Sequence, residues 1–145
     1  MEGKLVAICL SEAKGTAKKA VPSGWLVVNH GLQDDAHAGN WHRQVSLLSW
    51  QKVVEFNQKG AAVDHGDFGE NLLVDGIDLR SLPVGTRLAV GSALLEVTQI
   101  GKQCHSHCQI FHRVGDCVMP REGIFAKVLT GGEIKTGDII TTTSQ

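Results

Sequence analysis

The sequence has 145 residues, of which 42% are hydrophobic and 20% are charged, so it is neither collagen-like nor disordered in composition, and its length predicts a single domain over residues 1–145. The formal net charge of −1, from 14 basic and 15 acidic side chains, argues against a nucleic-acid partner, which would require a broad basic face. No apolar run is long enough for a membrane helix, and the N-terminus lacks a signal-peptide pattern, so we expect a cytoplasmic protein with no membrane partner.

Short strands separated by turns dominate the first half of the chain. Glycine accounts for 17 residues, an excess that favours tight turns, and the apolar runs Lys4–Leu10 and Gly24–Val28 predict strands on either side of a loop over Lys14–Pro22. From residue 46 to 60 the apolar residues instead recur every three to four positions, and Ser49 is suited to cap a helix. We therefore predict a helix within residues 46–60.

The second half has the pattern of further strands and one more short helix. Leu72–Val74 predicts a strand, and residues 86–90 and 93–100 predict a hairpin, because Gly91-Ser92 suits a tight primed turn. Residues 104–114 favour a short helix, whereas 124–130 and 139–143 are rich in β-branched residues. The predicted fold is all-β with short helices, β-rich α+β in class, with a twisted sheet that closes into a small barrel and leaves few exposed edges.

A first polar constellation follows the second predicted strand, between residues 34 and 44. Asp35 and His37 lie two residues apart, and Arg43 follows shortly after. A guanidinium group can donate two parallel hydrogen bonds to a phosphate or carboxylate, and a carboxylate can orient an imidazole, so these residues are suited to hold an anion. The alternative is a solvated loop that contains an internal Asp–His contact.

A second constellation, His65–Asn71, precedes the strand at residue 72. Its glycines allow close approach of a ligand to the backbone, and Glu70 and Asn71 could hydrogen-bond a heterocycle with both donors and acceptors. The alternative is a bulged turn that Asn71 stabilises. Further along the chain, Arg121 lies in a Pro-Arg-x-Gly turn that could present it to an anion.

Three of the four cysteines fall in one short histidine-rich segment, which is the strongest indication of chemistry. Cys104 follows a glycine turn and has Lys102 and two histidines nearby, a setting that favours the thiolate, which can transfer sulfur or bind a soft metal. One alternative is structural zinc held by Cys104, Cys108 and a histidine, although no Cys-x-x-Cys pair is present. The other is a buried, unreactive thiol; for Cys9, inside a predicted strand, we expect this core role.

Taken together, several strings in this order resemble a MOSC domain, the family named for the C-terminal part of molybdenum cofactor sulfurases, over roughly residues 4–140. The resemblance implies a β-barrel akin to the small barrel domain of pyruvate kinase, with a cleft for the pterin of molybdenum cofactor and a reactive cysteine. The strings are Asp35-Ala-His-Ala-Gly39, Arg43-Gln-Val-Ser-Leu47, Gly66-Asp-Phe-Gly-Glu-Asn-Leu72, Leu82-Pro-Val-Gly85, the Cys104 turn and Gly123-Ile-Phe125.

On this resemblance Cys104 corresponds to the family cysteine, either as a persulfide carrier or as a molybdenum ligand, with Cys108 as the alternative ligand. From their donor chemistry, we expect Arg43 and Arg121 to bind the pterin phosphate, Glu70 and Asn71 to contact the ring, and Asp35 with His37 to shape the pocket.

The predicted function is sulfur transfer to molybdenum cofactor, or handling of the cofactor, with a sulfurtransferase-type carrier cysteine. The chain has no room for a PLP-binding desulfurase domain, so the expected partners are a PLP-dependent cysteine desulfurase, cofactor-biosynthesis proteins or a recipient molybdoenzyme. The alternatives are a protein-interaction module, either zinc-stabilised or metal-free, and a molybdenum-dependent reductase of N-hydroxylated compounds.

Overall fold

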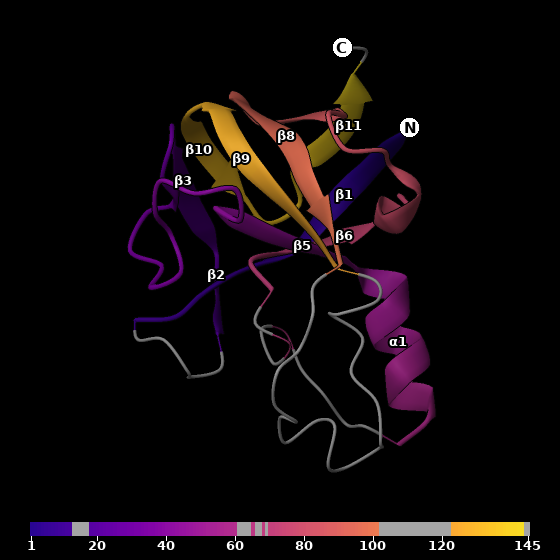
Figure 1. Cartoon of the computed structure of the whole chain (residues 1–145). Helices are drawn as coiled ribbons and strands as arrows, with labels where there is room; N and C mark the ends of the chain where they lie inside the picture. The colour runs from indigo at the N-terminus through magenta and orange to yellow at the C-terminus, as the bar shows by residue number, and fades with distance from the viewer. Residues whose placement is uncertain (13–17, 61–64, 66–67, 69, 102–122, 144–145) are drawn as a thin grey trace.

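The computed structural model describes residues 1–12, 18–60, 65, 68, 70–101 and 123–143 (Figure 1). Eleven strands, one α-helix and one short 3-10 helix are defined within these residues. They are β1 (Glu2–Leu10), β2 (Lys19–Val21), β3 (Ser23–Val27), β4 (Gly31–Leu32), β5 (Val45–Ser49), α1 (Trp50–Gln58), β6 (Leu72–Asp75), η1 (Leu79–Ser81), β7 (Arg87–Val90), β8 (Ala93–Ile100), β9 (Ile124–Thr130), β10 (Gly132–Lys135) and β11 (Ile139–Thr143).

Seven of these strands close into a mixed barrel in the order β11-β7-β8-β9-β5-β6-β1. Strand β2 is an additional strand that pairs with the C-terminal end of β1. Pairing of β1 with β11, at Glu2↔Thr141 and Lys4↔Ile139, completes the ring. The β5–β6 pair is parallel, and the other described strand pairs of the barrel are antiparallel. Closure satisfies the edge hydrogen-bonding groups of the sheet. The predicted β-rich barrel is therefore confirmed.

A smaller sheet, β10-β3-β4, lies against one end of the barrel. Its β4 residue Gly31 has φ +121°, and a side chain there would collide with the Gln44 backbone carbonyl. Only glycine combines this positive φ with such close contact. The close approach fixes the course of the chain just before β5, where the first polar constellation lies.

The hydrophobic core forms two clusters. The larger fills the barrel with aliphatic side chains such as Leu5, Leu47 and Leu95, all fully buried. The smaller lies between the sheet and α1 and contains Phe56, Phe68 and Phe125. Cys9 is completely buried in this second cluster, which confirms its predicted place in the core.

The helix predicted within residues 46–60 is confirmed as α1, which begins at Trp50, after Ser49 in the N-cap position. The Ser49 hydroxyl donates to the Ile77 carbonyl and makes no side-chain capping bond. Val45–Ser49, for which no strand was predicted, is strand β5; all five of its residues are buried, and it pairs with β6 on one side and β9 on the other. A strand covered on both faces has a continuous apolar run rather than an alternating one.

Most of the other predicted strands are confirmed, and one predicted loop contains a strand. The β7–β8 hairpin is present, with Gly91 at φ +55° in its turn, and β1, β3, β6, β9 and β11 occupy the predicted runs within one or two residues. The predicted loop over residues 14–22 contains strand β2, which pairs with the end of β1. The helix predicted in residues 104–114 lies outside the described residues. Within the described residues, no helix has the length and apolar character needed to cross a membrane.

Candidate functional site

A buried polar cluster lies where β1 ends and β6 begins. It consists of four buried residues, Lys18, Asp35, Ser46 and Asn71, and the part-buried His37, and we call it the Lys18 cluster. The Lys18 ammonium and the Asp35 carboxylate are 2.6 Å apart, and their side chains are 1% and 0% exposed. Two further donors reach the same carboxylate, the backbone amide of Ser11 at 3.0 Å and the Asn71 side-chain amide at 3.1 Å. The Asp35 carboxylate is thus satisfied from three directions inside the protein.

The contact between His37 and Asp35 is mediated by Lys18. The Lys18 Nζ atom lies 3.0 Å from His37 Nδ1 as well as 2.6 Å from Asp35, so the ammonium stands between the two residues that the sequence had paired. A solvated loop was the alternative interpretation, but Asp35 is buried. Sequence reasoning missed Lys18 because it lies in a lysine-containing loop of ordinary surface composition, and no local pattern distinguishes it from Lys19.

Asn71 joins three separate segments of the chain. Its side-chain oxygen accepts from the Ser46 amide at 2.9 Å and the Ser46 hydroxyl at 3.2 Å, and its nitrogen donates to the Cys9 carbonyl at 3.0 Å and to Asp35. Four hydrogen bonds use the full capacity of a primary amide. A contact with a pterin ring would therefore have to replace one of them.

Glu70 is equally enclosed. The residue is fully buried, and one of its carboxylate oxygens accepts from the Phe68 amide at 3.1 Å. In this structure Glu70 and Asn71 brace the loop that leads into β6. The contact of Glu70 and Asn71 with the cofactor ring stays a prediction, as do the binding roles expected of Asp35, His37 and Arg43.

The surroundings of Asp35 favour its ionised form. Burial raises the pKa of this carboxyl, but the hydrogen bonds from Lys18, the Ser11 amide and Asn71, together with the charge of Lys18, outweigh burial and lower the pKa below its ordinary value. Asp35 is therefore a permanent anion at neutral pH. Its charge is balanced inside the cluster by Lys18.

We expect Asp35→Asn to destabilise the protein at neutral pH but not at acidic pH. Because the folded-state pKa of Asp35 lies below that of the unfolded chain, the stabilisation is complete above about pH 3.9 and is lost as pH falls through the folded value. The expected cost at pH 7 is about 1.5–3 kcal/mol, the contribution of hydrogen bonds to a charged group. Urea unfolding of both proteins between pH 7 and pH 3 measures it; a difference that stays constant over this range would contradict the prediction.

An aromatic and cationic surface adjoins the Lys18 cluster. It consists of Trp41, His42, Arg43 and Phe125, and we call it the Arg43 shelf. The Arg43 guanidinium carbon lies 4.5 Å from the Trp41 ring centroid and 5.6 Å from that of Phe125. Trp41 is 40% exposed and donates from Nε1 to the His37 carbonyl at 3.2 Å, which joins the shelf to the cluster.

Arg43 has a donor without an acceptor. Its Nε atom is buried and has no hydrogen-bond partner among the described residues. The two aromatic rings attract the guanidinium without consuming its N–H groups. A stacked guanidinium with an unused donor is suited to bind an oxyanion.

The Arg43 shelf borders the two ends of the cysteine-containing segment. His42 Nε2 is 2.9 Å from the Gln99 side-chain oxygen, and the Gln99 amide donates to the Gly101 carbonyl at 2.7 Å. The Gly101 amide in turn donates to the Gly123 carbonyl at 2.6 Å. Gly101 and Gly123, the described residues on either side of residues 102–122, therefore lie side by side near the shelf; Cys104, Cys108 and Arg121 themselves lie outside the described residues.

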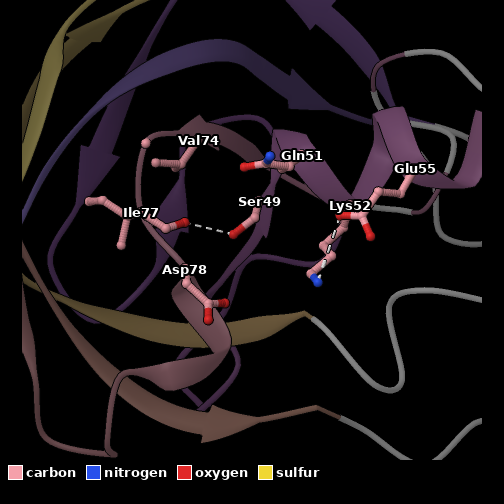
Figure 2. A pocket seen from close by; sticks show the side chains of 8 residues that line it. Ser49, Gln51, Lys52, Glu55, Val74, Ile77 and Asp78 are labelled. Carbon is pink, nitrogen blue, oxygen red and sulfur yellow. Dashed lines mark hydrogen bonds and ion pairs between the residues drawn. The ribbon is translucent and has the colours of Figure 1, made fainter.

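A separate hollow of about 330 Å³ lies at the start of α1, and it contains none of the predicted site residues. Figure 2 shows Ser49 bonded to the Ile77 carbonyl on one wall, with Lys52 and Glu55 along the helix. Across the described parts of the chain, no group of three or more His, Cys, Asp or Glu side chains is arranged to hold a metal ion. The zinc hypothesis rests on Cys104 and Cys108, which those parts do not include.

Comparison with known proteins decides the family. The model of the MOSC domain matches residues 34–141, most of the chain and all of the predicted site residues. The chain belongs to the MOSC domain family. This confirms the resemblance drawn from the sequence strings. Lys18 precedes the matched region of this MOSC domain.

Solved structures share the fold of this MOSC domain. The YuaD protein from Bacillus subtilis is 22% identical, with a TM-score of 0.81 over 100% of this chain and 98% of that one. YiiM from Geobacillus stearothermophilus is 19% identical, with a TM-score of 0.74 over 98% of this chain and 75% of that one. YiiM from Escherichia coli is 18% identical, with a TM-score of 0.70 over 100% of this chain and 71% of that one. No curated protein gave a significant match. At these identities the likeness extends to the fold alone.

Proposed function

We propose that this MOSC domain binds molybdenum cofactor and passes sulfur to it through the thiolate of Cys104. Family membership supports the cofactor class, and the single observation that most supports a bound anion is the buried Arg43 Nε without an acceptor. When bound, the cofactor would supply a molybdenum centre that accepts sulfur. The residues of this chain would supply binding, orientation and the transferable atom.

The donor set of the Arg43 shelf fits a phosphorylated pterin. A guanidinium can offer parallel N–H groups to two phosphate oxygens, and the contacts of Arg43 with two aromatic rings would limit its rotational freedom, so less entropy is lost when it binds. The exposed face of Trp41 adds a flat apolar surface suited to a heterocycle. Arg43 would therefore hold the phosphate, and Trp41 would orient the ring beside it.

The short sequence distance between Cys104 and Gly101 supports a role for Cys104 beside the same shelf. In the sequence, Cys104 follows Gly101 by three residues and Arg121 precedes Gly123 by two, and Gly101 and Gly123 are hydrogen-bonded to each other beside the shelf. Arg121 thus remains a second phosphate-binding candidate.

The sulfur transfer proposed for Cys104 needs a persulfide donor. The thiolate would attack the terminal sulfur of a partner's persulfide, and the partner's cysteine would leave as a thiolate. A PLP-dependent cysteine desulfurase is the class of partner that supplies such a persulfide, and a molybdoenzyme would receive the sulfurated cofactor. Free thiol chemistry of this kind requires a reducing compartment, as in the proposed cytoplasmic location.

We expect Arg43→Met to lower the pterin content of protein co-expressed with the cofactor pathway by about tenfold, the effect of losing one charge-assisted hydrogen bond. Pterin fluorescence and elemental molybdenum, each per mole of purified protein, measure it. Arg87→Met is the matched control, because Arg87 Nε is also buried without a partner but lies on β7, outside the shelf. Equal pterin in wild type and Arg43→Met, or none in wild type, would reject the proposal.

A further inference from the structure

Lys18 is buried and His37 is part-buried, and the geometry of their contact determines where the imidazole carries its proton. We propose that Lys18 is a positioning residue that holds His37 as the neutral tautomer with its proton on Nε2. The observation is the 3.0 Å contact between Lys18 Nζ and His37 Nδ1, next to the 2.6 Å contact between Lys18 Nζ and Asp35. The tautomer follows from the chemistry of these two contacts.

The tautomer of His37 depends first on the charge that Lys18 carries. Asp35 accepts hydrogen bonds from the Ser11 amide and from Asn71 in addition to Lys18, an environment that stabilises the ionised carboxylate over the carboxylic acid. A separation of 2.6 Å between nitrogen and oxygen is typical of a charge-assisted bond between an ammonium and a carboxylate. The buried side chain of Lys18 is therefore an ammonium.

The charge on Lys18 determines which nitrogen of the His37 ring carries the proton. An ammonium has three donors and no lone pair, so it can only donate to Nδ1. Nδ1 must then be unprotonated, and the single proton of the neutral ring is on Nε2. Protonation of both nitrogens would remove the acceptor and would place two positive charges 3.0 Å apart in a part-buried site.

This tautomer determines which chemistry His37 offers. Any group that is hydrogen-bonded to Nε2 must be an acceptor, so His37 selects an oxygen acceptor over a donor. Its backbone is also tied to the Arg43 shelf, because its carbonyl accepts from Trp41 Nε1 at 3.2 Å. The ligand consequence rests on the proposed function: a phosphate or ring carbonyl oxygen of the pterin is the acceptor that Nε2 would bind, and His37 would act as a donor rather than as a base.

Nitrogen NMR of the whole, ligand-free chain tests the tautomer directly. With ¹⁵N-labelled histidine, His37 Nδ1 should show the shift of an unprotonated ring nitrogen and Nε2 that of a protonated one at neutral pH, assigned by His37→Gln. In Lys18→Met both shifts should move toward the average of two tautomers, whereas those of His30, assigned by His30→Gln, should stay the same. A proton on Nδ1, or on both nitrogens, in the wild-type protein would overturn the proposal even if Lys18→Met fails to fold.

Two replacements of His37 separate this inference from the proposed function. Glutamine keeps an N–H donor near the position of Nε2, and leucine does not, so pterin content should fall by about tenfold more in His37→Leu than in His37→Gln. Equal pterin in both variants would reject the donor role while leaving cofactor binding intact. Absence of pterin from the wild-type protein would reject the proposed function but would leave the NMR result standing.

Discussion

Replacing Lys18 with methionine is expected to lower the free energy of unfolding by about 3–5 kcal/mol, which is the usual cost of removing one partner of a buried ion pair. The change leaves the Asp35 carboxylate inside the protein without its counter-charge. Both side chains are essentially inaccessible to water, so solvent cannot replace the lost interaction. Urea unfolding at neutral pH, followed by intrinsic tryptophan fluorescence, measures the change.

Two controls separate the buried charge from other effects. Lys127→Met breaks the 3.2 Å pair with Glu96, whose side chains are 42% and 24% exposed, and should cost no more than about 1 kcal/mol. The double variant Lys18→Met with Asp35→Leu removes both charges and should regain part of the loss. Equal costs for Lys18→Met and Lys127→Met would show that the Lys18 cluster contributes no more than a surface pair.

Replacing Cys104 with serine is expected to abolish sulfur loading altogether, because a hydroxyl cannot form a persulfide. After incubation with a PLP-dependent cysteine desulfurase and cysteine, intact-mass spectrometry should find one additional sulfur atom on the wild-type chain and none on the variant. Treatment with a thiol reductant should remove the added mass from the wild-type protein. The expected effect is all or none.

The remaining cysteines provide the controls for this experiment. Cys108→Ser and Cys117→Ser should load sulfur as the wild type does, and Cys9 is buried in the core and inaccessible to a partner. Loading that persists in Cys104→Ser but disappears in Cys108→Ser would transfer the carrier role to Cys108. Loading in none of the proteins, with an active desulfurase, would reject sulfur transfer as the function.

Local signals predicted the fold well wherever the physical cause was itself local. The β7–β8 hairpin depends on Gly91 adopting a positive φ between two runs of β-branched and aliphatic residues, and such a turn is specified by neighbouring residues. Val45–Ser49 was not predicted as a strand, because its burial comes from strands β6 and β9, which lie about 25 and 80 residues further along the chain. A short, fully buried strand and a buried helical segment have the same apolar pattern.

The candidate site residues also divide into those indicated by the local sequence and those seen only in the tertiary structure. Asp35, His37 and Arg43 were proposed as site residues from residue types alone, because carboxylate, imidazole and guanidinium groups are limited to a few roles wherever they cluster. Lys18 was missed, and so was the use of Asn71 to join β1, β5 and Asp35. These contacts span 17 to 62 residues of sequence, and no local pattern records such a separation.

Composition and turn chemistry were thus sufficient to predict a β-rich barrel, and the resemblance of several sequence strings indicated the MOSC family. Closure of the barrel determined the rest: it brought Lys18 between Asp35 and His37, and placed the Gly101–Gly123 junction beside the Arg43 shelf. The physical reason is that the charge state and hydrogen-bonding role of a side chain depend on burial and on its nearest polar neighbours. Those neighbours come from distant parts of the chain, so they are defined only after it has folded.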